Sequence, residues 1–124
     1  MTLTLRSTQD PSTRQPLTRA ACLALLALGG DGRVAATKRS LPIIIPVRFT
    51  LFGDDIVFSP GPGESLSPAI ANSVVAFQAD HIGSDGTALW GVHVTAVART
   101  LADGPEAPTF RLSSEIITGW RAGS

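Results

Sequence analysis

The stretch from Leu41 to Leu66, LPIIIPVRFTLFGDDIVFSPGPGESL, constrains the fold more than any other part of the chain. It contains two apolar runs, residues 43–52 and 56–58, separated by Gly53-Asp54-Asp55. Both runs are rich in β-branched and aromatic residues, which suit the pleated surface of a sheet, and Gly-Asp is a typical tight-turn pair between strands. The stretch therefore predicts a β-hairpin.

Side chains alternate along the first strand of this hairpin. The odd positions from Ile43 to Leu51 are all apolar, whereas the even positions from Ile44 to Phe52 are mixed. Because successive side chains of a strand point to opposite faces, the odd set is predicted inside the fold and the even set outside, toward a site or a partner. Pro46 cannot donate to a ladder, so the strand is expected to be at an edge or bulged there.

A proline- and glycine-rich segment, residues 59–63, follows the hairpin, and residues 64–72 are predicted as a short helix. Proline lacks a backbone donor and glycine permits unusual dihedral angles, so this segment cannot continue the strand. A loop between a strand and a helix can direct backbone N–H groups at an anion, and it can equally be a plain connection. Both interpretations stay open at this point.

The rest of the chain predicts one more helix and four more strands. Thr18 is expected to cap a helix that runs to about Leu28 and ends at Gly29-Gly30. The strands are expected over residues 33–37, 73–79, 88–100 and 109–120, with turns at 38–40 and 80–87 and a loop at 102–108. Six antiparallel strands with two short helices predict a mainly β, closed barrel, since closure removes sheet edges. Residues 1–16 are expected to be a flexible arm, 17–121 the barrel and 122–124 a tail.

Composition narrows the classes of function. A chain of 124 residues with 44% hydrophobic and 16% charged residues is expected to be one packed domain. Ten basic and ten acidic residues cancel, which argues against non-specific nucleic-acid binding. No apolar run reaches the roughly 20 residues of a membrane span. The apolar segment 20–28 lacks a signal-peptide cleavage site, so a cytoplasmic location is expected. The single cysteine, Cys22, excludes an internal disulfide and is expected to be buried.

The hairpin resembles that of the pyridoxamine 5′-phosphate oxidase-like family, the FMN-binding split β-barrels, in its small actinobacterial-type members. The matching residues are Pro46, Val47, Phe49, Gly53, Asp54, Ile56, Phe58, Gly63 and Leu66. Arg48 replaces the usual Asn, Ser59-Pro60 the usual Arg-Thr and Ser65 the usual Lys, and the last three positions hold the flavin phosphate in the family. The resemblance extends over residues 17–121, through Cys22-Leu23, through Trp90, Val92, Val94 and Thr95, and through Glu115, Thr118, Gly119 and Arg121.

This resemblance implies a six-stranded antiparallel split β-barrel that forms a homodimer and binds FMN or a deazaflavin at the subunit interface. It implies an oxidoreductase acting on a small organic substrate, in which the hydride chemistry belongs to the cofactor. The cofactor-binding residues would be Pro46, Val47, Arg48, Ser59, Pro60, Gly61, Gly63, Ser65, Leu66, Trp90 and Trp120. The altered phosphate positions leave two alternatives: a cofactor-free relative that binds or cyclises a small hydrophobic metabolite, and a non-catalytic dimer.

Several side chains keep more than one interpretation. His93 is a candidate general acid or base, or a hydrogen-bonded interface histidine, and the histidines form no recognisable metal set. Arg48 could pair with a ligand phosphate or carboxylate, pair with Glu64 or Glu115 across a dimer seam, or be a solvated surface residue. Trp120 is expected against a partner, a ligand or the core, and Trp90 in the core. Phe52, Trp120 and the broad apolar face of the first helix also favour a homodimer.

Overall fold

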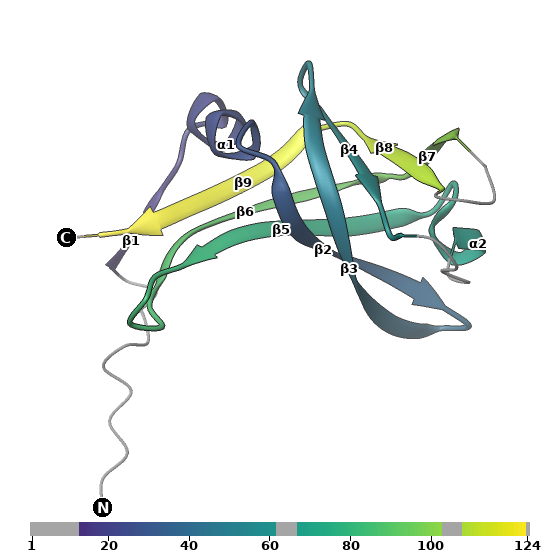
Figure 1. The fold of residues 1–124 in the computed structure, drawn as a ribbon, viewed down its shortest axis with the longest axis horizontal. Coiled ribbons are helices and arrows are strands. Elements are labelled where there is room, and N and C mark those ends of the chain that lie inside the picture. The colour runs from purple at the N-terminus through teal and green to yellow at the C-terminus, as the bar shows by residue number, and fades with distance from the viewer. Residues whose placement is uncertain (1–12, 62–66, 103–107, 124) are drawn as a thin grey trace, which may run out of the picture.

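The computed structural model describes residues 13–61, 67–102 and 108–123, and nine antiparallel strands form one sheet in these ranges (Figure 1). The strand order is β1-β9-β6-β5-β2-β3-β4-β8-β7. The strands are β1 Arg14–Pro16, β2 Gly30–Lys38, β3 Leu41–Phe52, β4 Asp55–Ser59, β5 Val74–Ile82, β6 Ala88–Val97, β7 Arg99–Ala102, β8 Thr109–Leu112 and β9 Ile116–Ala122. The helices described are α1 Arg19–Leu26 and α2 Ser67–Ile70.

The predicted class, a mainly β antiparallel split β-barrel, is confirmed, but the described residues contain nine strands rather than six. Residues 14–16, expected in the flexible arm, pair with β9, so the folded part extends to Arg14. The predicted strand 88–100 divides at Ala98 into β6 and β7, and the predicted strand 109–120 divides into β8 and β9. The predicted closure was wrong, because in the described residues β1 and β7 each pair on one side only and remain as edges.

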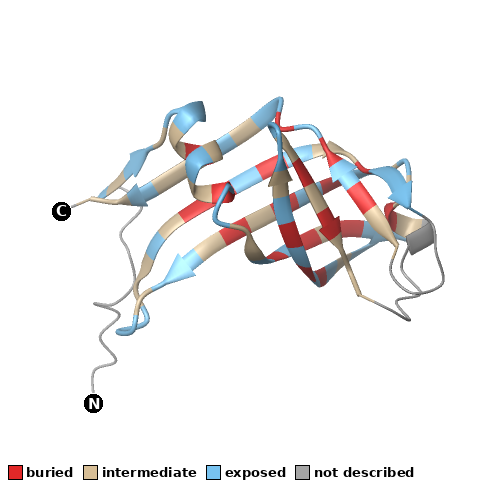
Figure 2. Ribbon diagram, turned by 45° about the horizontal axis from the view of Figure 1, so that its top comes forward, coloured by how far each residue is buried: buried red, intermediate tan, exposed pale blue. Residues whose placement is uncertain are grey.

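The hairpin organises the core as its alternation predicted. Ile45, Val47 and Phe49 are buried, whereas the even positions of β3 are exposed (Figure 2). Two aromatic pairs fill the interior: Phe49 meets Phe77 edge-on at 5.0 Å between ring centroids, and Phe58 stacks on Phe110 at 5.4 Å. β4 pairs only with residues 48–52 of β3, so Pro46 lies beyond the end of that ladder, at a free strand edge, as expected.

Helix α1 covers one end of this core, against β9, β6 and β3. Thr18 caps it as predicted, accepting a hydrogen bond from the Ala21 N–H at 3.1 Å. The helix ends at Leu26, before the expected Leu28, and Gly29 turns the chain with a φ of 66°. Cys22 is buried as expected, and burial raises the pKa of its thiol. In the part of the chain described, no helix is long and apolar enough to cross a membrane.

Candidate functional site

A groove lies beside Arg48, at the end of the ladder between β3 and β4. Arg48 pairs in register with Ser59, the last residue of β4, and the chain then turns away through Pro60 and Gly61. The Arg48 groove has a volume of about 270 Å³, and its lining residues are Asp31, Pro46, Val47, Arg48, Ser59, Pro60 and Gly61. The fold thus brings together six of the residues that the sequence nominated; Gly63, Ser65 and Leu66 lie outside the described residues.

A second hollow lies on the other side of the same guanidinium. Its volume is about 330 Å³, and Thr50, Val57 and Thr109 line it together with Arg48 and Ser59. Arg48 and Ser59 therefore border both spaces. A ligand larger than either hollow could extend along both sides of the Arg48 side chain.

The electrostatic neighbour of Arg48 is Asp31, which the sequence analysis did not nominate. Asp31 on β2 lies opposite Arg48 in the ladder, and its Oδ1 is 3.5 Å from Arg48 Nε. Both side chains are more than four-fifths exposed, at 81% for Arg48 and 84% for Asp31, so the pair is solvated and weak. Of the two expected acidic partners, Glu115 lines a different pocket, and Glu64 lies outside the described residues.

Hydrogen-bond donors in the Arg48 groove are few among the described residues. Pro60 has no N–H, and the Gly61 N–H donates to Ser59 Oγ at 3.3 Å. The Arg48 guanidinium carries five N–H donors, and Asp31 is its one ion-pair partner in the described chain. An anion at this groove would therefore be held chiefly by Arg48, beside the exposed apolar ring of Pro46.

The other nominated residues lie elsewhere in the chain. His93 is exposed on the outer face of the sheet, in register with Gln78 and Thr118. His93 and Pro46 lie in one row across the sheet, with Gln78 and Arg33 between them. Three strand spacings separate the two residues, a distance of about 14 Å. His93 therefore does not line the Arg48 groove of its own chain, and its acid–base role stays a prediction. No group of three or more His, Cys, Asp and Glu side chains in the described ranges could hold a metal ion.

The two tryptophans also lie away from the groove within one chain. Trp90 is half-buried against the core, as expected, and His81 stacks on it at 6.5 Å between ring centroids. Trp120 is half-buried between Gly91 and Arg14, whose guanidinium lies 3.8 Å from the indole centroid. Trp120 thus packs on its own chain, and its expected contact with a partner or a ligand is untested.

Comparisons with known proteins bear on this geometry. A family model described as pyridoxamine 5′-phosphate oxidase matches residues 18–122. The structure is similar to that of the FAD binding protein from Mycobacterium smegmatis, with 29% identity, a TM-score of 0.72, and coverage of 87% of this chain and 97% of that one. A FAD-binding protein from Mesorhizobium loti, 20% identical, shares the fold with a TM-score of 0.72 over 89% of this chain and 99% of its own. A search of curated proteins gives no match.

Proposed function

This chain belongs to the pyridoxamine 5′-phosphate oxidase family, and from that premise we propose that it is a flavin-binding oxidoreductase whose flavin occupies the Arg48 groove. The observation that carries the proposal is the exposed Arg48 guanidinium beside an apolar strand surface, with space on both of its sides. The likeness to a FAD binding protein at 29% identity supports a flavin of some kind.

The groove residues fit a flavin with a single phosphate contact. Arg48 would hold the phosphate, because its planar guanidinium donates to two oxygens at once. Pro46 would bear the apolar ring system, together with the main chain at Val47, whose side chain is buried in the core, and Ser59 would border the ribityl chain. The flavin, when bound, supplies hydride transfer, and the chain binds and orients it. FMN is the first candidate ligand, since one guanidinium matches one terminal phosphate. FAD and a deazaflavin are the alternative ligands against which its affinity is compared.

Absorbance of the purified protein and a fluorescence titration test this proposal. We expect saturable binding of FMN, and a loss of about tenfold or more in Arg48→Ala, because a charge-assisted contact contributes roughly 1.5–3 kcal/mol. Arg39→Asn is the matched control: Arg39 sits in the β2–β3 turn with a φ of 51°, which Asn tolerates, and lines no part of the groove. Unchanged FMN affinity in Arg48→Ala would contradict the site.

The alternative is a cofactor-free protein that binds a small hydrophobic metabolite. The Asp31 carboxylate beside Arg48 and the missing N–H of Pro60 favour it, because both weaken a phosphate site. A colourless protein that binds neither FMN, FAD nor a deazaflavin would support this alternative. The substrate and a cytoplasmic location stay predictions.

We also propose a homodimer, supported by an uncharged and mostly apolar row of residues on the outer face of the sheet. The row consists of five residues in register across β3, β2, β5, β6 and β9: Ile44, Ala35, Ala76, Thr95 and Ile116. Ile44 and Ile116 are 71% and 64% exposed at its ends, and the smaller side chains of Ala35, Ala76 and Thr95 lie between them. Two twisted sheets packed face to face approach most closely at their centre, where small side chains fit.

Light scattering across a dilution series tests the homodimer. The wild type should show twice the chain mass, and Ile44→Glu should show a single chain mass. Leu41→Glu serves as the matched control, because Leu41 is a similarly exposed aliphatic residue outside the row. A wild-type monomer at micromolar concentration would refute this assembly.

A further inference from the structure

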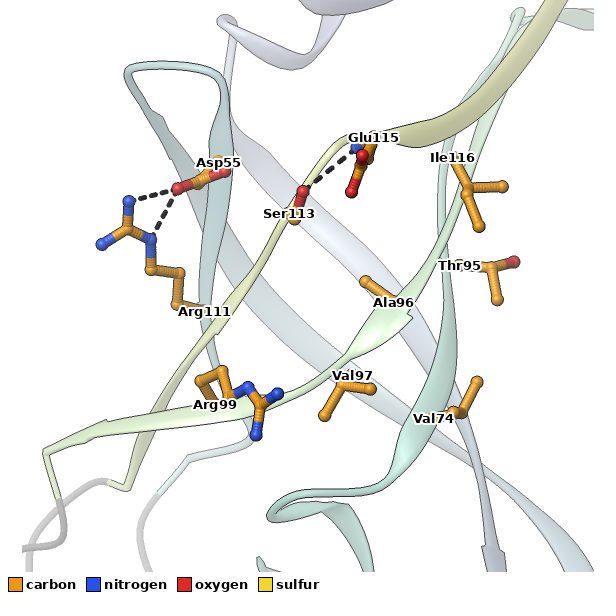
Figure 3. Close-up of a pocket in the computed structure, with 10 residues that line it drawn as sticks. All are labelled: Asp55, Val74, Thr95, Ala96, Val97, Arg99, Arg111, Ser113, Glu115 and Ile116. Atoms are coloured by element: carbon orange, nitrogen blue, oxygen red, sulfur yellow. Dashed lines mark hydrogen bonds and ion pairs between the residues drawn. The ribbon is translucent and has the colours of Figure 1, made fainter.

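A further pocket, separate from both hollows beside Arg48, lies where two predicted strands break (Figure 3). Its volume is about 430 Å³, which lies within the range of small-molecule sites. The walls come from Val74 of β5, the end of β6, Arg99 of β7, and the connection from Arg111 of β8 to Ile116 of β9. We call it the Arg99 pocket; it shares no lining residue with the two hollows beside Arg48.

Specific bonds fix the walls of the Arg99 pocket. At the β6–β7 break, the Ala98 N–H donates to the Ser73 carbonyl at 2.9 Å, and the Ala98 carbonyl accepts from the Asn72 N–H at 2.8 Å. At the β8–β9 break, Arg19 of α1 donates to the carbonyl oxygen and to the Oγ of buried Ser114. The pocket is therefore preformed rather than a space between loose segments.

The charges of the Arg99 pocket are only partly paired within the described chain. Arg111 and Asp55 form an ion pair, with Nε 2.6 Å from Oδ2, and so neutralise each other. Arg99 has one long contact, at 3.5 Å, to Asn72 Oδ1. The Glu115 N–H donates to Ser113 Oγ, and the Glu115 carboxylate has no described partner. One guanidinium and one carboxylate thus remain available to a ligand.

The available charges lie at opposite ends of the pocket. Figure 3 shows Arg99 at one end and Glu115 at the other, with Ala96 between them and Val74, Thr95 and Ile116 along one side. Val74 and Ile116 line the pocket and are 65% and 64% exposed, so both present aliphatic surface to it. The pocket therefore combines two separated, opposite charges with an aliphatic side wall.

We propose that the Arg99 pocket binds a small zwitterion of the ω-amino carboxylate class. Its carboxylate pairs with Arg99, its ammonium group with Glu115, and its methylene chain lies against Val74 and Ile116. A ligand with a single charge leaves the other protein charge partly desolvated and unpaired, which lowers its affinity. An α-amino acid carries both charged groups on one carbon atom, so it is expected to bind more weakly than a ligand whose charges are separated by a methylene chain.

Titration calorimetry with 4-aminobutanoate and 6-aminohexanoate tests the proposal, with hexanoate and hexylamine as single-charge comparators. We expect saturable binding of at least one zwitterion, and binding about tenfold or more weaker for both comparators. If neither zwitterion binds saturably to the wild type at millimolar concentration, or if hexanoate or hexylamine binds equally well, the proposal is overturned.

Charge-removing variants give a second, independent readout. Arg99→Gln should weaken the binding of the zwitterion and of hexanoate but leave the binding of hexylamine unchanged. Glu115→Gln should weaken the binding of the zwitterion and of hexylamine but leave the binding of hexanoate unchanged. Arg39→Asn and Asp54→Asn, which change exposed turn residues outside the pocket, should leave all affinities unchanged. A loss of folding alone cannot produce this exchange of selectivity, and uniform weakening of all ligands would overturn the assignment of the two ends.

The mass of each variant distinguishes this proposal from the homodimer, because Thr95 and Ile116 belong both to the pocket and to the outer row. Loss of zwitterion binding with an unchanged mass supports the pocket as a ligand site. A fall in mass in Arg99→Gln or Glu115→Gln, with zwitterion affinity unchanged, would assign these charges to a subunit seam and overturn the ligand site.

Discussion

Asp31→Asn should increase the affinity for FMN, because the Asp31 carboxylate competes with a phosphate for Arg48. The two charged atoms are 3.5 Å apart, and at that distance the attraction in water is about 1 kcal/mol. High exposure of both side chains keeps the value at this aqueous limit rather than at that of a buried pair. Removing the carboxylate should therefore increase FMN affinity up to about fivefold at low ionic strength.

A double-mutant cycle with Arg48→Ala measures this coupling. FMN fluorescence is titrated against wild type, each single variant and the double variant, at low and at high salt. Most of the gain from Asp31→Asn should disappear when Arg48 is absent, and it should shrink at high salt, where exposed charges are screened. Asp54→Asn, in the β3–β4 turn, controls for net charge. An equal gain in Asp54→Asn, or a gain that persists without Arg48, would refute the reasoning.

Three further predictions concern other parts of the chain. Gly91→Ser should lower the free energy of unfolding by roughly 1–3 kcal/mol in a urea titration, because a Cβ would lie 2.9 Å from Nε1 of Trp120; an equal cost in a Trp120→Ala background would contradict this cause. Pro60→Thr combined with Ser65→Lys should increase FMN affinity about tenfold or more by restoring the family's phosphate ligands, and an unchanged affinity would mean that the groove itself differs. Cys22 should resist iodoacetamide in the native protein at mildly alkaline pH and react fully in guanidinium chloride, since burial raises its thiol pKa; rapid native labelling would contradict that burial.

Much of the barrel could be predicted because one hairpin fixes the inside and the outside of the sheet. The turn at Gly53 sets the β3–β4 register, and strict alternation along β3 assigns its odd residues to the core. The free edge at Pro46 followed from its missing N–H alone. The residues of the Arg48 groove were nominated from the family resemblance of this same hairpin, whose β3–β4 ladder ends at Arg48 and Ser59.

Asp31 was missed because its neighbours disfavour a strand by propensity. Gly30 and Gly32 flank it, and the expected strand therefore began at residue 33. In the structure β2 nevertheless runs through these glycines. Gly32 packs so closely on the Phe77 ring that a Cβ would lie only 2.8 Å from it, so this position of the strand requires glycine. The signal was nevertheless present in the register: counting back from the two-residue turn at Arg39-Ser40 pairs Asp31 with Arg48.

The Arg99 pocket depends on two strand breaks, and only one of them leaves a trace in the sequence. Along residues 109–120 the buried positions are Phe110, Leu112 and Ser114, but β9 turns Ile117 toward the core, so the alternation changes phase between the two strands. Along residues 88–100 the core side includes Val94 and then Ala98, with no change of phase, so periodicity passes through the break unaltered.

The break at Ala98, between β6 and β7, coincides with main-chain hydrogen bonds from Ala98 to the distant residues Asn72 and Ser73. No local sequence pattern can reveal such bonds. The positions of Arg99 and Glu115 at opposite ends of one pocket are thus a product of tertiary structure. A resemblance based on strand motifs can therefore nominate the residues of the Arg48 groove, which belong to one hairpin. It cannot nominate the Arg99 pocket, whose walls come from segments that are far apart in the sequence.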